Sequence, residues 1–171
     1  MDIIMKKKLG RKNGFTLLEL MSVVVIIGIM AAIGIPTMDT AIKKIRFKSD
    51  SNTIMSGLRL ARSQAIAKRI QYGVSFDPNS KEFAVFEDIN NPSSFTYDGS
   101  DSIIMVDTLG RGIESFTTTF NNDLIFFFPD GRASMTGNIN GTATWDPESV
   151  ASVQISVLAA TGRIKVDSLT Y

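Results

Sequence analysis

The feature that most constrains the fold of this chain is an apolar run near its start, GFTLLELMSVVVIIGIMAAIGIP, residues 14–36. Its 21 residues from Phe15 to Ile35 would reach roughly 30 Å as a helix, the thickness of the hydrocarbon core of a bilayer. A helix in water keeps polar residues along one face, but here the polar residues are few: Thr16, Glu19 and Ser22. The run is therefore predicted to be a membrane segment.

The residues before the run predict its orientation. Asp2 is the only acidic residue there, against five basic ones: Lys6, Lys7, Lys8, Arg11 and Lys12. A positive cluster ahead of the first span keeps that end in the cytoplasm. The rest of the chain is expected on the far side of the membrane.

Two simpler kinds of membrane segment are a cleaved secretory signal and an uncleaved anchor. A cleaved secretory signal has an apolar core of about 7–15 residues followed by small residues. The sequence MAA from Met30 loosely fits such a cleavage site, but the run is too long and contains a carboxylate. An uncleaved anchor carrying a domain that never polymerises stays open as an alternative.

Glu19 is the residue that separates these alternatives. A carboxylate in the apolar layer costs on the order of 2.5–3.5 kcal/mol, so it is a functional candidate that needs a partner. It is also near the start of the run, where it could simply reach water. A cut between Gly14 and Phe15 would place a new α-amino group one helical turn from Glu19. That group could neutralise the carboxylate within one chain or between neighbouring helices.

Residues 14–19, Gly-Phe-Thr-Leu-Leu-Glu, and the basic leader resemble the type IV prepilin signature. The resemblance implies cleavage after Gly14 by a prepilin peptidase on the cytoplasmic side, with N-methylation of Phe15. It also implies that Glu19 acts in filament assembly and that Pro36 kinks the helix. Leu18 stands where the family usually has isoleucine, a conservative change.

Composition narrows the function further. The chain has no cysteine and no histidine, which removes thiol nucleophiles, the commonest general base and the commonest transition-metal ligands. Residues 39–69 contain eight basic and two acidic residues, and those beyond Ile70 contain five basic and thirteen acidic, a net charge of −8. We expect no catalysis, no metal and no cofactor, and an acidic domain is a poor general binder of nucleic acid.

After Pro36 the chain keeps a helical period. Apolar residues recur at three- and four-residue spacing at Ile42, Ile45, Ile54, Leu58, Ala61, Ala65 and Ile66. We expect this stripe to face the globular part. The polar residues 49–52 interrupt it and indicate a kink or break. The simplest prediction is one long helix from Phe15 to about Gln71.

From Tyr72 the period changes to two. Seven short strands are predicted, at residues 72–76, 82–88, 103–107, 124–128, 143–145, 152–158 and 163–169. The sequences DPNS after Phe76 and PDGR after Phe128 predict turns. Residues 88–102 predict a long polar loop. Trp145 and Phe126–Phe128 are expected in the core, with one of the three phenylalanines on the opposite sheet face.

Three blocks of the chain, one in the predicted helix and two in the strand region, resemble the GspH/FimT minor pseudopilin family. They are LRLARSQAI (residues 58–66), LIFFFPDGRAS (124–134) and SVQISVLAATGRIKV (152–166). The resemblance implies an α+β, type IV pilin-like fold, in which a long N-terminal membrane-spanning helix packs on a small antiparallel β-rich head. The expected divisions are a leader (1–14), a membrane helix (15–35), its soluble continuation (36–71) and the head (72–171).

The Thr161-Gly162-Arg163 turn and Lys165 form a candidate surface site. Arg163 and Lys165 are two residues apart, so on a strand they share one face and could hold phosphate or an acidic partner. Some family members that act in DNA uptake are taken to meet DNA at a similar turn. The alternative, which the acidic head favours, is an ordinary hairpin turn with a solvated lysine.

Taken together, the sequence predicts a minor pilin or pseudopilin subunit of a type II secretion pseudopilus or a type IV pilus. It is expected in a bacterial inner membrane, with its N-terminus cytoplasmic and its head periplasmic, and later in the filament. Its expected partners are other pilins, the prepilin peptidase, the inner-membrane assembly platform and the lipid bilayer. A DNA-binding minor pilin is the alternative function.

Overall fold

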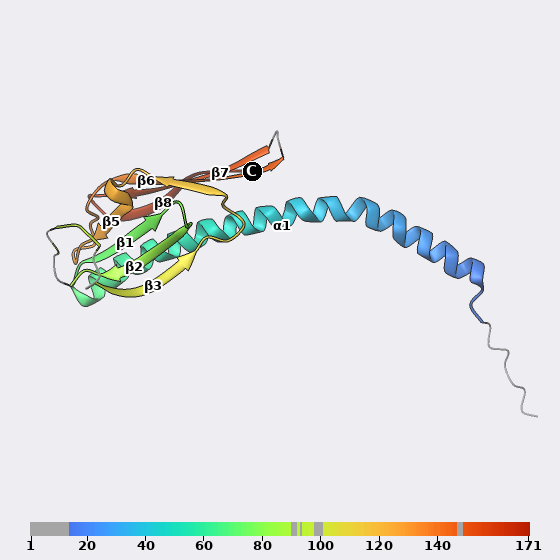
Figure 1. The fold of residues 1–171 in the computed structure, drawn as a ribbon, viewed down its shortest axis with the longest axis horizontal. Coiled ribbons are helices and arrows are strands. Elements are labelled where there is room, and N and C mark those ends of the chain that lie inside the picture. Colours follow the sequence, from blue (N-terminus) through green and yellow to red (C-terminus); the bar gives the residue numbers. More distant parts are fainter. Residues whose placement is uncertain (1–13, 90–91, 93, 98–100, 147–148) are drawn as a thin grey trace, which may run out of the picture. The chain divides into compact units, whose positions relative to one another are not determined.

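The computed structural model describes residues 14–89, 92, 94–97, 101–146 and 149–171 (Figure 1), without the side chains of residues 34–37 and 146. The predicted leader therefore lies outside the described residues except for Gly14. The chain divides into two compact units, residues 1–39 and 40–171. The helix α1, Leu17–Lys68, contributes to both units.

In the second unit, one face of α1 is buried. Four residues of the predicted stripe are in the core, Ile54, Leu58, Ala61 and Ala65, and Phe47 joins them. The prediction was wrong at both ends of the stripe, because Ile42, Ile45 and Ile66 are exposed. Phe47 is the reason at the N-terminal end. Its position sets the buried face so that Ile45 points away from the domain.

The expected break at residues 49–52 is not present, because α1 is continuous through them. Instead, two of their polar side chains have partners. The Asp50 carboxylate accepts hydrogen bonds from the backbone N–H groups of Gly112 (2.9 Å) and Ile113 (3.0 Å), and the Ser51 hydroxyl donates to the Phe47 carbonyl within the helix (2.8 Å). Asp50 thereby fastens the loop before β4 to the helix.

Among the residues that the structure describes, eight strands form two four-stranded antiparallel sheets. The first sheet has the order β3-β2-β1-β5 and the second β4-β6-β7-β8. The strands of the first sheet are β1 Tyr72–Asp77, β2 Glu82–Glu87, β3 Ser102–Thr108 and β5 Leu124–Phe127. Those of the second are β4 Ser115–Thr118, β6 Gly137–Asp146, β7 Ser149–Leu158 and β8 Arg163–Thr170. A 3₁₀ turn, η1 Asn121–Asp123, precedes β5.

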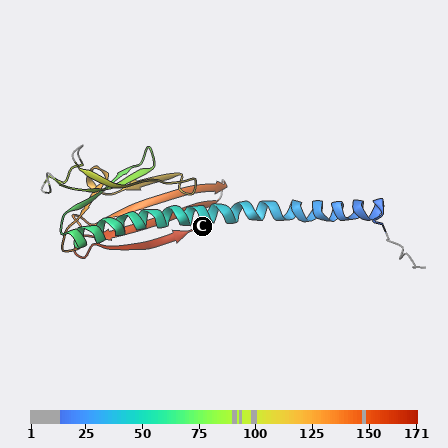
Figure 2. The ribbon, with the colours of Figure 1, turned by 90° about the horizontal axis from the view of Figure 1, so that it is seen from below.

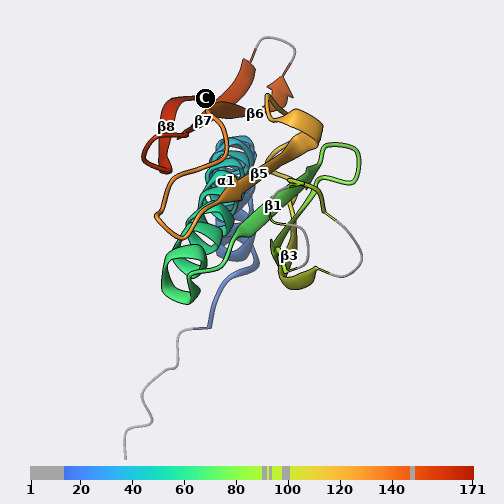
Figure 3. The same cartoon turned by 90° about the vertical axis from the view of Figure 1, so that its left-hand side faces the viewer.

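Within this unit, α1 lies against both sheets, as the views in Figures 2 and 3 show. Gly57 of α1 sits so close to the first sheet that a Cβ there would lie 2.3 Å from the Phe83 ring. Phe47 meets the second sheet, where its ring packs edge-on to Trp145 with centroids 6.2 Å apart. The predicted α+β fold with an antiparallel head is confirmed.

Every predicted strand segment overlaps an observed strand, and both predicted turns are present, but β4 and the first half of β6 were missed. The reason in β6 is its glycines. A Cβ at Gly137 would lie 2.6 Å from the Phe120 ring, and one at Gly141 would lie 3.0 Å from Val153. Side chains from elsewhere fill those positions, so the strand lacks the alternating pattern that sequence reasoning requires.

The aromatic strand β5 buries side chains on both faces. Phe127 lies in the main core, whereas Phe126 packs on the outer face against Phe86, with ring centroids 5.8 Å apart. Phe86 in turn lies over Gly73, where a Cβ would be 2.2 Å from its ring. The expectation that one phenylalanine faces the opposite side is confirmed. Trp145 is partly buried against the core.

Replacing Asp50 by alanine should destabilise the domain by on the order of 1–3 kcal/mol, because two buried backbone N–H groups lose their acceptor. Thermal unfolding of the full-length chain in detergent, followed by circular dichroism, measures the change. The matched control is Asn52→Ala, an exposed residue of the same polar segment, which should change stability by less than about 0.5 kcal/mol. Equal melting temperatures for the two variants would contradict the role given to Asp50.

Candidate functional site

The start of α1 combines an exposed extended segment with a capped helix end. Residues 14–16 are outside the helix and exposed. The Thr16 hydroxyl accepts a hydrogen bond from the Glu19 backbone N–H (3.2 Å), and the Thr16 carbonyl accepts one from Leu20 (3.1 Å). Thr16 is therefore the N-cap, and Glu19 sits three residues later, where a carboxylate also favours the positive end of the helix dipole.

The bond between Gly14 and Phe15 is open to an approaching protein. Phe15 is 72 % exposed, and no atom lies within 4 Å of the position a Cβ on Gly14 would take. The helix begins only at Leu17, so no helical hydrogen bond needs to be broken to bring this bond into an active site. On its C-terminal side, the predicted cut is therefore followed by exposed residues that lie outside the helix.

Beyond Glu19 the first unit presents an apolar surface on every side of the helix. Its large apolar residues from Leu17 to Ile33 are all substantially exposed, from 42 % at Val23 to 79 % at Leu18. Glu19 is the one ionisable residue of this segment. A helix that is hydrophobic all round needs lipid or other helices around it.

No single described helix meets both the length and the hydropathy conditions of a membrane span. The segments Leu17–Ile33 and Met38–Lys68, on either side of residues 34–37, meet them together. Pro36, the predicted kink, falls in this gap, and its side chain lies outside the described ones.

The predicted surface site on the β7–β8 turn carries less positive charge than its sequence implies. The Lys165 ammonium is 2.9 Å from the Asp167 carboxylate. Hydrogen bonds from Ser156 and Lys165 lower the pKa of Asp167, and the nearby Arg163 charge adds to the effect. Arg163, Lys165 and Asp167 are all exposed on this strand, so the surface has two cations and one anion.

The structure also gives the turn a role that the sequence analysis missed. Arg62 of α1 donates one hydrogen bond to the Gly131 carbonyl (3.0 Å) and another to the Thr161 carbonyl (3.0 Å). A Cβ on Gly162, which has φ of +59°, would lie 2.1 Å from the Gly131 oxygen. One arginine thus holds together the PDGR turn and the TGR turn, each of which has a glycine in the left-handed region.

A signal for Arg62 was available in the sequence. It lies next to Ala61 and four residues after Leu58, on the side of the helix that packs inward. A cation at such a place needs acceptors. The three sequence blocks that resemble the GspH/FimT family each contribute to this contact.

At the C-terminal end of α1, Lys68 and Tyr72 share the Glu87 carboxylate. The Tyr72 hydroxyl donates to it at 2.8 Å, and the Lys68 ammonium lies 3.5 Å away. The hydrogen bond with Tyr72 raises the pKa of Lys68, and burial raises the pKa of Tyr72. Both shifts favour the protonated forms, so the stability they contribute is present below their unfolded values near pH 10 and lost as the pH rises further.

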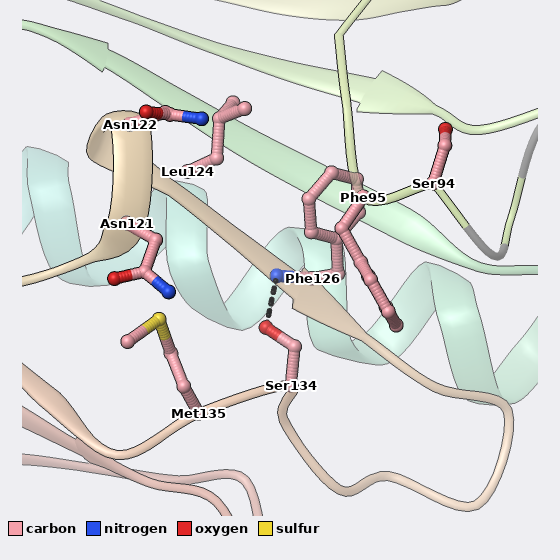
Figure 4. Close-up of a pocket in the computed structure, with 8 residues that line it drawn as sticks. All are labelled: Ser94, Phe95, Asn121, Asn122, Leu124, Phe126, Ser134 and Met135. Carbon is pink, nitrogen blue, oxygen red and sulfur yellow. Dashed lines mark hydrogen bonds between the residues drawn. The ribbon is translucent and has the colours of Figure 1, made fainter.

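A pocket of about 300 Å³ lies beside β5 (Figure 4). The eight described residues that line it are neutral: Ser94, Phe95, Asn121, Asn122, Leu124, Phe126, Ser134 and Met135. The Ser134 hydroxyl accepts a hydrogen bond from the Phe126 backbone N–H at 3.1 Å. None of these described residues could act as a general acid or base.

Among the described residues, no three acidic side chains are grouped so that they could hold a metal ion. Asp77 instead accepts hydrogen bonds from the backbone N–H groups of Asn79 (2.9 Å) and Ser80 (3.4 Å) in the turn after β1. This is the turn role that its sequence position predicts.

Two family models match the chain. The type II transport protein GspH model covers residues 50–161, and the prokaryotic N-terminal methylation motif covers residues 9–35. No curated protein matches the chain.

Solved structures share the fold. The minor pseudopilin EpsH from the type 2 secretion system of Vibrio cholerae is 13 % identical, with a TM-score of 0.52, over 70 % of this chain and 94 % of that one. The type IV minor pilin FimU of Pseudomonas aeruginosa is 13 % identical, with a TM-score of 0.56, over 71 % of this chain and 88 % of that one.

Replacing Arg62 by alanine should cost about 1.5–3 kcal/mol, because a charged donor loses two carbonyl acceptors and the two turns lose their common fastening. Urea unfolding of the full-length chain in detergent gives the difference. Arg59→Ala is the matched control, since Arg59 is exposed and its guanidinium makes a long contact, 4.0 Å, with the Met55 sulfur. A loss as large for Arg59→Ala as for Arg62→Ala would remove the special role of Arg62.

Proposed function

Because the chain belongs to the GspH family of type IV pilin-like proteins, we propose that it is a minor pilin or pseudopilin subunit, cleaved after Gly14 and assembled through its N-terminal helix. It serves a type II secretion pseudopilus or a type IV pilus and performs no catalysis of its own. The observation that carries this proposal is one carboxylate, Glu19, in the first turn of α1, within a segment, Leu17–Ile33, that is otherwise uncharged and whose large apolar residues are all exposed.

Cleavage explains why that carboxylate is tolerated. In the proposal, the new chain begins at Phe15, directly before the N-cap, and its amino group is cationic. Methylation of an amine keeps its charge. The amino group of one subunit neutralises Glu19 of the next, so the cost of placing a carboxylate in the apolar layer is recovered only when helices bundle. Assembly is thereby favoured over isolated subunits in the bilayer.

The pilin role also implies a location and partners for each part of the chain. The leader stays in the cytoplasm, where a prepilin peptidase cleaves the exposed junction and N-methylates Phe15. The helix is held in the inner membrane of a bacterium, with Pro36 as its kink, and the β-rich head lies in the periplasm. From there an inner-membrane assembly platform passes the subunit into a filament with other pilins. The exposed apolar surface of residues 17–33 supports both the lipid and the helix-bundle stage.

The alternative of a DNA-binding subunit has weaker support. Non-specific affinity for DNA grows with the number of phosphates that cations neutralise. At the β7–β8 turn, Lys165 is already paired with Asp167, and the chain beyond Ile70 has a net charge of −8. The pilin role needs no such contact, and we therefore favour it.

Intact-mass and N-terminal sequencing of the chain purified from its native membrane should give a protein that begins with N-methylated Phe15. The expected mass corresponds to loss of residues 1–14 and gain of one methyl group. The same chain from cells without prepilin peptidase is the control and should retain Met1. A chain that keeps its leader in cells with the peptidase would leave only an anchored domain.

Glu19→Ala should lower recovery of the chain in sheared filaments by about tenfold or more, because the loss of a pairing worth upwards of 1.4 kcal/mol shifts an equilibrium by that factor. The amount of chain in the membrane should stay unchanged, since an apolar residue enters the bilayer more easily. The matched control is Ser22→Ala, one turn further along the helix, where the hydroxyl donates only to the Glu19 carbonyl (2.8 Å). Normal incorporation of Glu19→Ala would overturn the assembly role given to Glu19, whereas absence of the unaltered chain from sheared filaments would favour the anchor that never polymerises.

A further inference from the structure

A shallow groove of about 380 Å³ crosses the outer face of the first sheet. Its floor includes the small residues Ser75 and Ala84, and its wall includes Tyr97, Ile103 and Val106. Side chains alternate along a strand, and Phe76 and Phe83, the neighbours of the floor residues, are in the core beneath α1. The groove therefore faces away from the chain's own helix.

The wall of this groove is the edge strand β3. Ile103 is 49 % exposed and Val106 is 55 % exposed. Edge strands are usually protected by lysine, proline or a covering segment. The sequence of β3, SIIMVDT, has neither lysine nor proline. An exposed apolar edge of this kind is a surface on which another chain can pack.

One end of the groove is acidic. Asp77 and Glu82 line it and are exposed. Neither is in an ion pair with any residue that the structure describes. Hydrogen bonds from Ser80 and Asn79 lower the pKa of Asp77, which keeps its carboxylate charged. The surface that complements this groove is therefore apolar, to cover Ile103 and Val106, and carries cations at its border, to pair with Asp77 and Glu82.

The same chain presents such a surface at the start of the helix in the second unit. Ile42 and Ile45 are 41 % and 69 % exposed, on the side of α1 opposite Phe47. Arg46 and Lys48 are exposed on either side of these two isoleucines. Residues 42 and 45 lie on one helix face, and residues 46 and 48 border it.

We propose that the face made by Ile42, Ile45, Arg46 and Lys48 of one subunit occupies the groove of a second copy. The isoleucines cover Ile103 and Val106, and the cations pair with Asp77 and Glu82. The contact joins two different surfaces, so each added copy leaves one of each surface unused. Such a heterologous contact is compatible with a filament, because the unused surfaces at either end stay available to neighbouring pilins. This inference rests on the proposed function, because it describes how subunits meet outside the membrane.

The natural absence of cysteine makes the contact testable by disulfide cross-linking. Two full-length single variants, Ile45→Cys and Val106→Cys, carry different epitope tags and are expressed together in the native membrane. Oxidation should give a dimer that contains both tags, whereas each variant alone should give at least about fivefold less. A double variant should give a ladder of multimers.

The matched control pairs Ile45→Cys with Leu158→Cys, a residue of similar exposure (47 %) on the second sheet. The proposal would be overturned if the mixed dimer did not form or if the control pair cross-linked equally well. It would also be overturned if Val106→Cys formed dimers with itself as abundantly, or cross-linked to a different protein. Reversing the groove charges with Asp77→Lys and Glu82→Lys should lower the mixed dimer at least about fivefold. Adding Arg46→Glu and Lys48→Glu should restore it.

The two proposals fail separately. Recovery of the chain in sheared filaments reports on the pilin role, and the mixed dimer reports on the groove. A chain that enters filaments without the mixed dimer overturns only the second-copy contact. A chain that never enters filaments overturns the pilin role itself.

Discussion

The packing of one face of α1 against two sheets is the constraint on which the rest of the head depends. Phe47, Ile54, Leu58, Ala61 and Ala65 enter a single core with residues of both sheets. Neither four-stranded sheet could bury its inner face without the helix between them. Small residues at the contact let the sheets approach closely, and Gly57 beneath the Phe83 ring is the clearest example. The helix therefore organises the head as well as carrying the apolar segment.

Polar contacts then fix the loops on this helix. Asp50 holds the loop before β4, and Arg62 holds the turns at Gly131 and Thr161. These acceptors and donors belong to segments that are far apart in the sequence, so each contact closes a long stretch of chain. The fastening leaves the side of α1 opposite Phe47 exposed at Ile42 and Ile45. On the outer face of the first sheet, Phe86 and Phe126 are covered, whereas Ile103 and Val106 of β3 stay exposed.

Some features of the candidate sites could be predicted from the sequence and others could not. The signature around Gly14, Phe15 and Glu19 could be found in the sequence, because its features are local: a short motif and one carboxylate at the start of an apolar run. The limited charge of the Arg163 turn could not be predicted in the same way, because the partner of Lys165 depends on the register of β8. Arg62 was passed over because its acceptors lie 69 and 99 residues further along the chain.

What the sequence by itself determined is what depends on short-range patterns: the apolar helix, the alternating strands and the two turns. Only the tertiary structure decided which residues of α1 face inward, since Phe47 takes the place expected for Ile45. It also decided that β6 is a ten-residue strand. The physical reason is that side chains distant in sequence, such as the Phe120 ring at Gly137, occupy the space beside the glycines of β6. Likewise, the buried face of α1 depends on which strands pack against it. No local pattern contains that information.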